Sequence, residues 1–213
     1  MDDLPEEKLA KQPSGIQLDG KAASRALGVH WDLETDCFVY KVNVSIDQTK
    51  PCTKRIILKK KATIYDPLGL LTPITLVAKL FMQELWRDQV EWDEEVSKSL
   101  KKRFGSWIVR MSVVASTIAV PSSLNLEEDQ DVQLHIFCDA SEKAFAAVAY
   151  VRVEIESIVS CHILLSKSRV NPLKKLTLPR LELQGAVLAV RLKETVVEEI
   201  DVKFSSVQFW TQQ

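Results

Sequence analysis

The feature of this sequence that most constrains its fold is a change of hydrophobic period after the polar run at 125–131. From Val132 to Cys138, apolar side chains occupy every second position, which is the period of a β-strand with one buried face. The expected elements are strands at 132–138, 145–153, 158–166 and 202–211, with a helix at 179–199 before the last strand. This β-β-β-α-β order predicts an α/β sheet in which the last strand lies parallel to the first.

The residues before this sheet divide into a polar lead and a small folded region. Residues 1–20 combine low hydrophobicity with two prolines, which predicts a disordered lead. Within 27–44, β-branched and aromatic residues on both sides of a polar turn predict a short hairpin. The pattern breaks again at Pro121. We therefore expect an α+β region at 21–125 and an α/β domain at 131–213.

Two helices are expected in the first region. Thr72 and Pro73 form a typical helix start, with proline at the first position. Apolar residues at steps of three and four then predict a helix to about Gln89. A second helix is expected to begin with Asp93 as its N-cap and to continue past Met111, with acidic residues in its first turn.

Composition excludes several classes of protein and function. The net charge of -1 means that a nucleic-acid partner would have to be met by local basic patches. No run approaches the length of about 18 apolar residues needed to span a membrane, and the polar first residues are unlike a signal peptide. The four cysteines have no metal-ligand spacing and suit a reducing compartment. We expect an intracellular protein, cytoplasmic or nuclear, that is neither secreted nor membrane-bound.

Seven ordered sequence blocks resemble the BEL/Pao class of LTR retrotransposons. The blocks are LGVHWD (27–32), TKRIIL (53–58), YDPLGLLTPITLVAKLFMQELW (65–86), WDEE (92–95), FCDASEKAFAAVAY (137–150), SKSRVNPLKKLTLPRLEL (166–183) and FWT (209–211). This stretch is identified as a member of the Pao retrotransposon peptidase family. It is similar to the part of the polyprotein that follows the polymerase palm and leads into ribonuclease H.

The resemblance implies a function in handling a template-primer duplex. Residues 27–120 would form a reverse transcriptase thumb and connection region, with a small hairpin and thumb-like helices. A truncated ribonuclease H-like β-β-β-α-β sheet would follow. The expected partners are an RNA–DNA hybrid, bound weakly, and the remainder of the polyprotein. The chain has no YxDD-type polymerase motif, so we expect no polymerisation by the chain itself.

The resemblance also implies a site for divalent ions. Ribonuclease H-like enzymes cleave phosphodiesters with two metal ions, commonly Mg²⁺, held by converging carboxylates. It assigns catalytic and metal-binding roles to Asp139, at the end of the first strand, and to Glu182, near the start of the helix. Gln212 stands where the family has a third carboxylate. Because that carboxylate is missing, we expect this fragment to be catalytically inactive by itself.

The residues alone leave these assignments open. Asp139 also suits an Asx-turn that closes a hairpin, and Glu182 also suits a helix N-terminus electrostatically. The candidate nucleic-acid-binding residues occur in two basic clusters, for which the alternative is a solvated charged face. They are Lys54 and Arg55 in the first cluster, and Lys167, Arg169 and Arg180 in the second.

Two other functions remain as alternatives. The family label suggests an aspartic peptidase, which needs two Asp-Thr/Ser-Gly turns that share a proton. The comparable motif here is Asp139-Ala140-Ser141, which lacks the glycine. The second alternative is a domesticated binding module in which the helical region serves a new host partner. We favour a retrotransposon polyprotein fragment over both.

Overall fold

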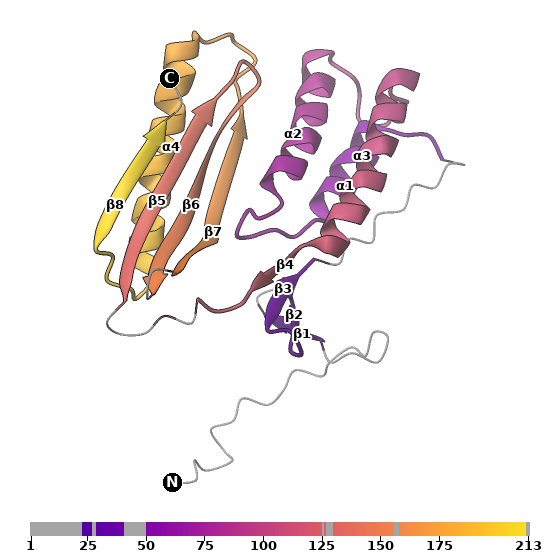
Figure 1. Ribbon diagram of the computed structural model, residues 1–213. Helices are drawn as coiled ribbons and strands as arrows, with labels where there is room; N and C mark the ends of the chain where they lie inside the picture. The colour runs from indigo at the N-terminus through magenta and orange to yellow at the C-terminus, as the bar shows by residue number, and fades with distance from the viewer. Residues whose placement is uncertain are drawn as a thin grey trace.

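The computed structural model describes residues 23–26, 29–40, 50–124, 126, 130–155 and 158–211. The lead expected at 1–20, and Gln212, lie outside the described residues. The elements, labelled in Figure 1, are β1 (Ala23–Ala26), β2 (Val29–Asp32), β3 (Cys37–Val39), α1 (Lys54–Ala62), α2 (Thr72–Arg87), α3 (Lys98–Thr117), β4 (Ala119–Pro121), β5 (Asp131–Ala140), β6 (Ala144–Ile155), β7 (Ile158–Val170), α4 (Leu178–Glu199) and β8 (Ser206–Thr211). None of the described helices combines the length and hydrophobicity that a membrane span requires.

The expected hairpin is part of a small antiparallel sheet with the strand order β1-β2-β3-β4. Its turn includes Asp36, which has a positive φ of 48° and accepts a hydrogen bond from Trp31 Nε1 at 2.9 Å. Hydrogen bonds from Ser122 and Trp31 lower the pKa of the Asp36 carboxyl. Strand β4 was not expected, because Pro121 interrupts the pattern. A proline is tolerated there because β4 is an edge strand.

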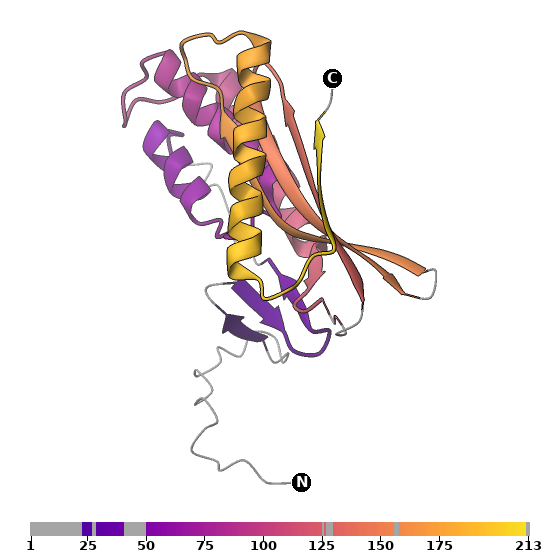
Figure 2. The ribbon, with the colours of Figure 1, turned by 90° about the vertical axis from the view of Figure 1, so that its left-hand side faces the viewer.

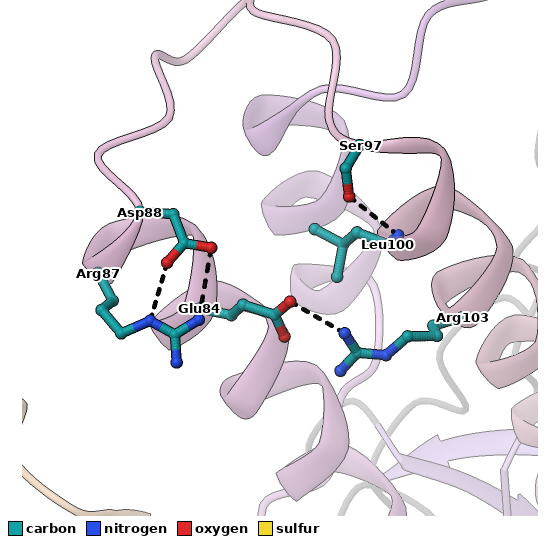
Figure 3. Close-up of polar contacts among 6 residues, drawn as sticks. All are labelled: Glu84, Arg87, Asp88, Ser97, Leu100 and Arg103. Atoms are coloured by element: carbon teal, nitrogen blue, oxygen red, sulfur yellow. Dashed lines mark hydrogen bonds and ion pairs between the residues drawn. The ribbon is translucent and has the colours of Figure 1, made fainter.

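The three first helices pack around one hydrophobic core. The rings of Phe81 on α2 and Phe104 on α3 meet edge to face, with 6.0 Å between their centroids. Trp107 stacks on Phe104, and its Nε1 donates to the carbonyl of Ile74 at 2.9 Å. The ion pair between Arg103 and Glu84, at 2.9 Å, links α3 to α2 at the surface (Figure 3).

The start of α3 differs from the expectation. Its N-cap is Ser97, whose hydroxyl accepts a hydrogen bond from the backbone N–H of Leu100 at 3.2 Å (Figure 3). The expected N-cap, Asp93, instead forms an ion pair with Arg55 at 2.7 Å. The residues between are not helical and include an isolated bridge from Thr53 to Glu95. The acidic residues were therefore wrongly assigned to a first helical turn.

The second sheet confirms the β-β-β-α-β prediction. Its strand order is β7-β6-β5-β8, and β8 pairs parallel with β5, with Thr211 opposite Cys138. Helix α4 covers one face of the sheet (Figure 2). The core between them is built from alternate residues of β5 and β6 and from one stripe of α4, namely Leu134, Ile136, Cys138, Phe145, Ala147, Ala149, Leu188, Ala189, Leu192 and Val196.

The helical region and the second sheet meet where α2 lies beside β7 (Figure 1). Residues of the helical region form hydrogen bonds with backbone groups of β7 and of Asn171, the residue that follows it. Ser166 N donates to the carbonyl of Leu68 at 2.9 Å, and Lys79 Nζ donates to that of Ser168 at 2.9 Å. Gln83 Nε2 donates to the carbonyl of Asn171. Part of an edge strand that would otherwise be unpaired is thereby covered.

Gly69 makes this close approach possible. It has a φ of 71°, in the left-handed region that favours glycine. A Cβ atom at this position would lie 1.9 Å from the carbonyl oxygen of Ser166. The Ser166 hydroxyl in turn donates to the Gly69 carbonyl. No other residue type fits this contact without a shift of the backbone.

Candidate functional site

Asp139 lies near the carboxyl end of β5, at the end of the alternating pattern. Its side chain is exposed, whereas that of Cys138 is buried beneath α4. Burial, with a smaller contribution from the Asp139 carboxylate, raises the pKa of the Cys138 thiol. One oxygen of Asp139 accepts a hydrogen bond from the backbone N–H of Ala140 at 2.7 Å. The carboxylate is therefore accessible and partly oriented by its own backbone.

Glu182 lies at the same end of the sheet as Asp139. Gly185 of α4 packs on the backbone of Asp139, since a Cβ atom added to it would lie 3.5 Å from the Asp139 carbonyl oxygen. Glu182 precedes Gly185 by three residues, which puts it on the same side of the helix, one turn closer to the N-terminus. It is the fifth residue of α4 and is exposed. The helix dipole favours acids most within the first turn, and Glu182 lies just past that turn.

The described residues do not supply a third carboxylate. No group of three or more histidine, cysteine, aspartate or glutamate side chains that could hold a metal ion occurs among them. Strand β8 is described as far as Thr211, opposite Cys138, so the expected third position, Gln212, remains untested. Two carboxylates at one end of a sheet can contact a divalent cation, because hard cations prefer oxygen ligands. They fall short of the set that a two-ion centre requires.

The first basic cluster is engaged within the protein. Lys54 is only 3% exposed. Its Nζ donates to the carbonyl of Val90 at 3.1 Å and lies 3.4 Å from the centroid of the Trp86 ring. Trp92 meets Trp86 edge to face, so the two rings flank the buried ammonium. Arg55 is exposed, but its guanidinium forms a bidentate ion pair with the Asp93 carboxylate. We therefore do not retain Lys54 as a phosphate contact.

The second basic cluster is exposed, and by strand alternation the side chains of Lys167 and Arg169 lie on the face of the sheet opposite to that of Ser168 and Asp139. Lys167 and Arg169 alternate along β7 with the buried Ser168. Ser168 lies in one row of the sheet with Asp139, because both pair with Ala146 of β6. The backbones of Ser168 and Asp139 are therefore two strand spacings apart, which amounts to about 10 Å. Arg180 is the third residue of α4 and is also exposed.

Sequence reasoning missed a pocket of about 530 Å³ beside Asp139. Its lining combines the Gly69–Pro73 segment with the face of the sheet opposite α4. Phe137 and Trp210 stack in this lining with their ring centroids 5.8 Å apart. His135 stacks on Trp210 and accepts a hydrogen bond from its Nε1 at 3.1 Å. The alternation in β5 indicated an outward row at these positions, but not the loop that covers it.

Comparison with known proteins gives one family match. The family model described as "Pao retrotransposon-like RNaseH-like domain" matches residues 53–213. No curated protein matches the chain. Among solved structures, a foamy viral protease-reverse transcriptase in complex with dsDNA is similar at 16% identity with a TM-score of 0.26. That match covers 89% of this chain and 36% of the viral one, and a likeness at this TM-score supports no inference about geometry.

Proposed function

Because the chain belongs to the Pao retrotransposon-like RNaseH-like domain family, we propose that it binds an RNA–DNA hybrid at the end of the second sheet where β5 ends and α4 begins. The observation that supports this most is the position of Asp139 and Glu182 at one end of the sheet, with Asp139 about 10 Å from Ser168, the residue between Lys167 and Arg169 on β7. The hybrid would be a template-primer duplex of the retrotransposon polyprotein, in which residues 21–125 act as thumb and connection and 131–213 as the ribonuclease H-like part.

Basic residues supply the affinity for the hybrid in this proposal. Lys167, Arg169 and Arg180 are exposed and would neutralise backbone phosphates, which requires no base sequence. Arg55 contributes less, because binding a phosphate would compete with its ion pair to Asp93. The net charge of -1 makes this local cluster the source of attraction.

Asp139 and Glu182 would serve as oxygen ligands for Mg²⁺ or Mn²⁺ next to the bound backbone. A divalent ion supplies charge neutralisation at the phosphate and, in a complete two-ion site, an activated water. In this proposal the two carboxylates hold one ion weakly, because no group of three or more potential metal ligands occurs among the described residues. We therefore propose that the chain by itself binds the hybrid without cleaving it.

Binding is tested by fluorescence anisotropy with a labelled RNA–DNA hybrid at several salt concentrations. The variant Lys167→Gln/Arg169→Gln/Arg180→Gln is expected to bind more weakly for all sequences, with a salt slope lower by about 1 for each lost phosphate contact. The matched control is Lys98→Gln/Lys102→Gln/Arg110→Gln, which removes three exposed charges from α3. Equal losses in the two variants would contradict the proposed surface.

The metal site is tested separately by Mn²⁺ electron paramagnetic resonance and by a cleavage assay. Asp139→Asn and Glu182→Gln are each expected to weaken Mn²⁺ binding, because each removes one charged oxygen ligand. The unaltered chain is expected to leave the hybrid intact, and Gln212→Asp to bind Mn²⁺ more tightly. Cleavage by the unaltered chain that Asp139→Asn abolishes would refute the proposed inactivity.

The aspartic peptidase alternative has no specific observation in its favour. Asp139 ends a strand and is followed by Ala140 and Ser141, and the Ser141 N–H donates to the carbonyl of Ala144 in the β5–β6 turn. That turn lacks the glycine of the peptidase motif.

A further inference from the structure

A second concave site lies where the helical region meets β7. We call it the basic groove, and it has a volume of about 380 Å³. One side is formed by the end of α1, the connection to α2 and the first turns of α2, and the other side by the last residues of β7. Its polar lining consists of Lys61, Asp66, Thr72, Thr75, Lys79, Ser166, Lys167, Ser168 and Arg169.

The charges in this groove are unbalanced. Among the described residues that line it, four are cationic and Asp66 is the one acid. The Asp66 carboxylate is already used within the protein. It accepts hydrogen bonds from the hydroxyl of Tyr40 at 3.1 Å and from the backbone N–H of Leu71 at 2.9 Å. The groove therefore has an excess of positive charge that its own residues do not neutralise.

Lys79 is the most enclosed of these cations. Its ammonium donates to both the carbonyl and the hydroxyl of Ser168, at 2.9 and 3.2 Å. Burial lowers the pKa of Lys79, the nearby charge of Lys61 lowers it further, and the Asp66 carboxylate opposes the shift. Because one acid faces four cations in this groove, a further anion would stabilise it.

The kind of anion follows from the other groups in the lining. Hydroxyls of Thr72 and Ser168 stand among the cations and can each donate one hydrogen bond, whereas that of Thr75 already donates to the carbonyl of Thr72 at 3.4 Å. A phosphate presents several oxygens and binds both lysine and hydroxyl donors. Ser168 also lies in the same row of the sheet as Asp139, so a strand bound at Asp139 would pass near the groove.

We propose that the basic groove binds one backbone phosphate of the nucleic acid, using Lys61 and Lys79 from the helical region together with the Ser168 hydroxyl from the sheet. This inference rests on the proposed hybrid binding and adds a contact point to it. Both parts of the chain then hold the same strand, and the contact between α2 and β7 fixes the spacing between the groove and the carboxylates.

The test is a scan with hybrids that carry a single neutral methylphosphonate at successive positions. For the unaltered chain, we expect one backbone position at which the neutral group weakens binding by about tenfold, the effect of losing roughly 1.4 kcal/mol. In Lys61→Gln/Lys79→Gln, a neutral group at that same position should no longer weaken binding. At every other position, the effect of the neutral group should match its effect on the unaltered chain. Lys102→Gln on α3 is the control and should behave like the unaltered chain.

A scan in which every position affects the double variant and the unaltered chain equally would overturn the inference. Lys61→Gln alone is the second variant, because Lys61 does not form the bonds to Ser168 that join α2 to β7. Circular dichroism and urea unfolding establish that each variant is folded.

Failure of the proposed function has a different signature. If the unaltered chain does not bind the hybrid, thermal unfolding is measured in inorganic phosphate and in chloride at equal ionic strength. Stabilisation by phosphate that Lys61→Gln/Lys79→Gln removes would support an anion site while refuting hybrid binding. No difference between the two salts would overturn both.

Discussion

Gly69 lies at the closest backbone approach in the junction of the two parts. Gly69→Ala should destabilise the chain by about 2 kcal/mol or more, because the substitution adds a strained positive φ and a clash with the Ser166 carbonyl. Urea unfolding measures the change. The control is Gly185→Ala, where the new Cβ meets Asp139 at an ordinary 3.5 Å within a helix, and there we expect little change or a gain of up to about 1 kcal/mol. Similar losses at both positions would contradict the role of Gly69.

Lys54 tests whether a basic stretch in the sequence is a surface feature. Lys54→Met should lower the free energy of unfolding by about 1.5–3 kcal/mol, since it removes a charged hydrogen bond to Val90 and the contact with Trp86. Hybrid affinity measured by anisotropy should stay unchanged. Arg55→Ala is the comparison and should leave stability unchanged, because its ion pair is exposed. A Lys54→Met protein of normal stability with weakened hybrid binding would restore Lys54 to the binding surface.

Individual residues were predictable where they depended on local spacing. The alternation of β5 predicts an exposed Asp139 after a buried Cys138, as the structure has it. The environment of Lys54 was not predictable, because Trp86 and Trp92 follow it by more than 30 residues and meet it only in the folded chain. The same holds for the groove, whose Lys61 and Lys79 come from separate helices, α1 and α2.

Helix α3 offers a test at the scale of one element. Ser97→Ala should cost about 1 kcal/mol of stability, the usual loss on removing an N-cap hydroxyl. Asp93→Ala, the substitution at the N-cap position expected from the sequence, should have no measurable effect, because Asp93 is exposed and lies outside the helix. Chemical denaturation measures both. A larger loss for Asp93→Ala than for Ser97→Ala would place the helix start at the earlier residue.

Long elements with a clear period were predictable, and short or strongly charged ones were not. Strands β5 to β7 and helices α2 and α4 follow the expected segments to within a few residues. Helix α1 was recognised only as a basic stretch, because its buried residues are Lys54 and Ile57 and give no apolar stripe. Strand β4 has three residues, too few for a period to appear.

The whole molecule should lose stability in mild alkali. Burial raises the pKa of the thiols of Cys52 and Cys138, and also that of the Tyr40 hydroxyl. Their raised folded-state pKa values mean that the unfolded chain releases protons first. Their contribution is therefore full below the unfolded thiol value of about 8.5 and declines above it.

Urea unfolding between pH 7.5 and 9.5 measures this effect, in a window set by the unfolded thiol value of about 8.5. The free energy of unfolding should stay nearly constant from pH 7.5 up to about 8.5 and fall above that value. Cys52→Ala/Cys138→Ala is the control. Its absolute stability will differ, but its decline with pH should be shallower. An identical slope in the two proteins would assign the decline to other groups.

At the scale of the whole chain, the order of elements was predictable and their assembly was not. The β-β-β-α-β order and the parallel pairing of β5 with β8 follow from the sequence. The packing of α2 on β7 depends on Gly69, Lys79 and Gln83, which have no marked pattern of their own. That packing sets the distance between the carboxylates and the basic groove. The sequence therefore indicates which charged residues are present, but not how they are arranged in space.

The contact between α2 and β7 also sets the order in which the molecule can be completed during synthesis. Its hydrogen bonds join residues that lie 88 to 98 positions apart in the chain. At a translation rate of about 5–20 residues per second, the second partner emerges roughly 5–20 s after the first. The helices α1 to α3 have a core of their own and can pack in that interval. The basic groove therefore cannot form until β7 has emerged, and a ribosome that stalls before β7 leaves α2 without its partner strand.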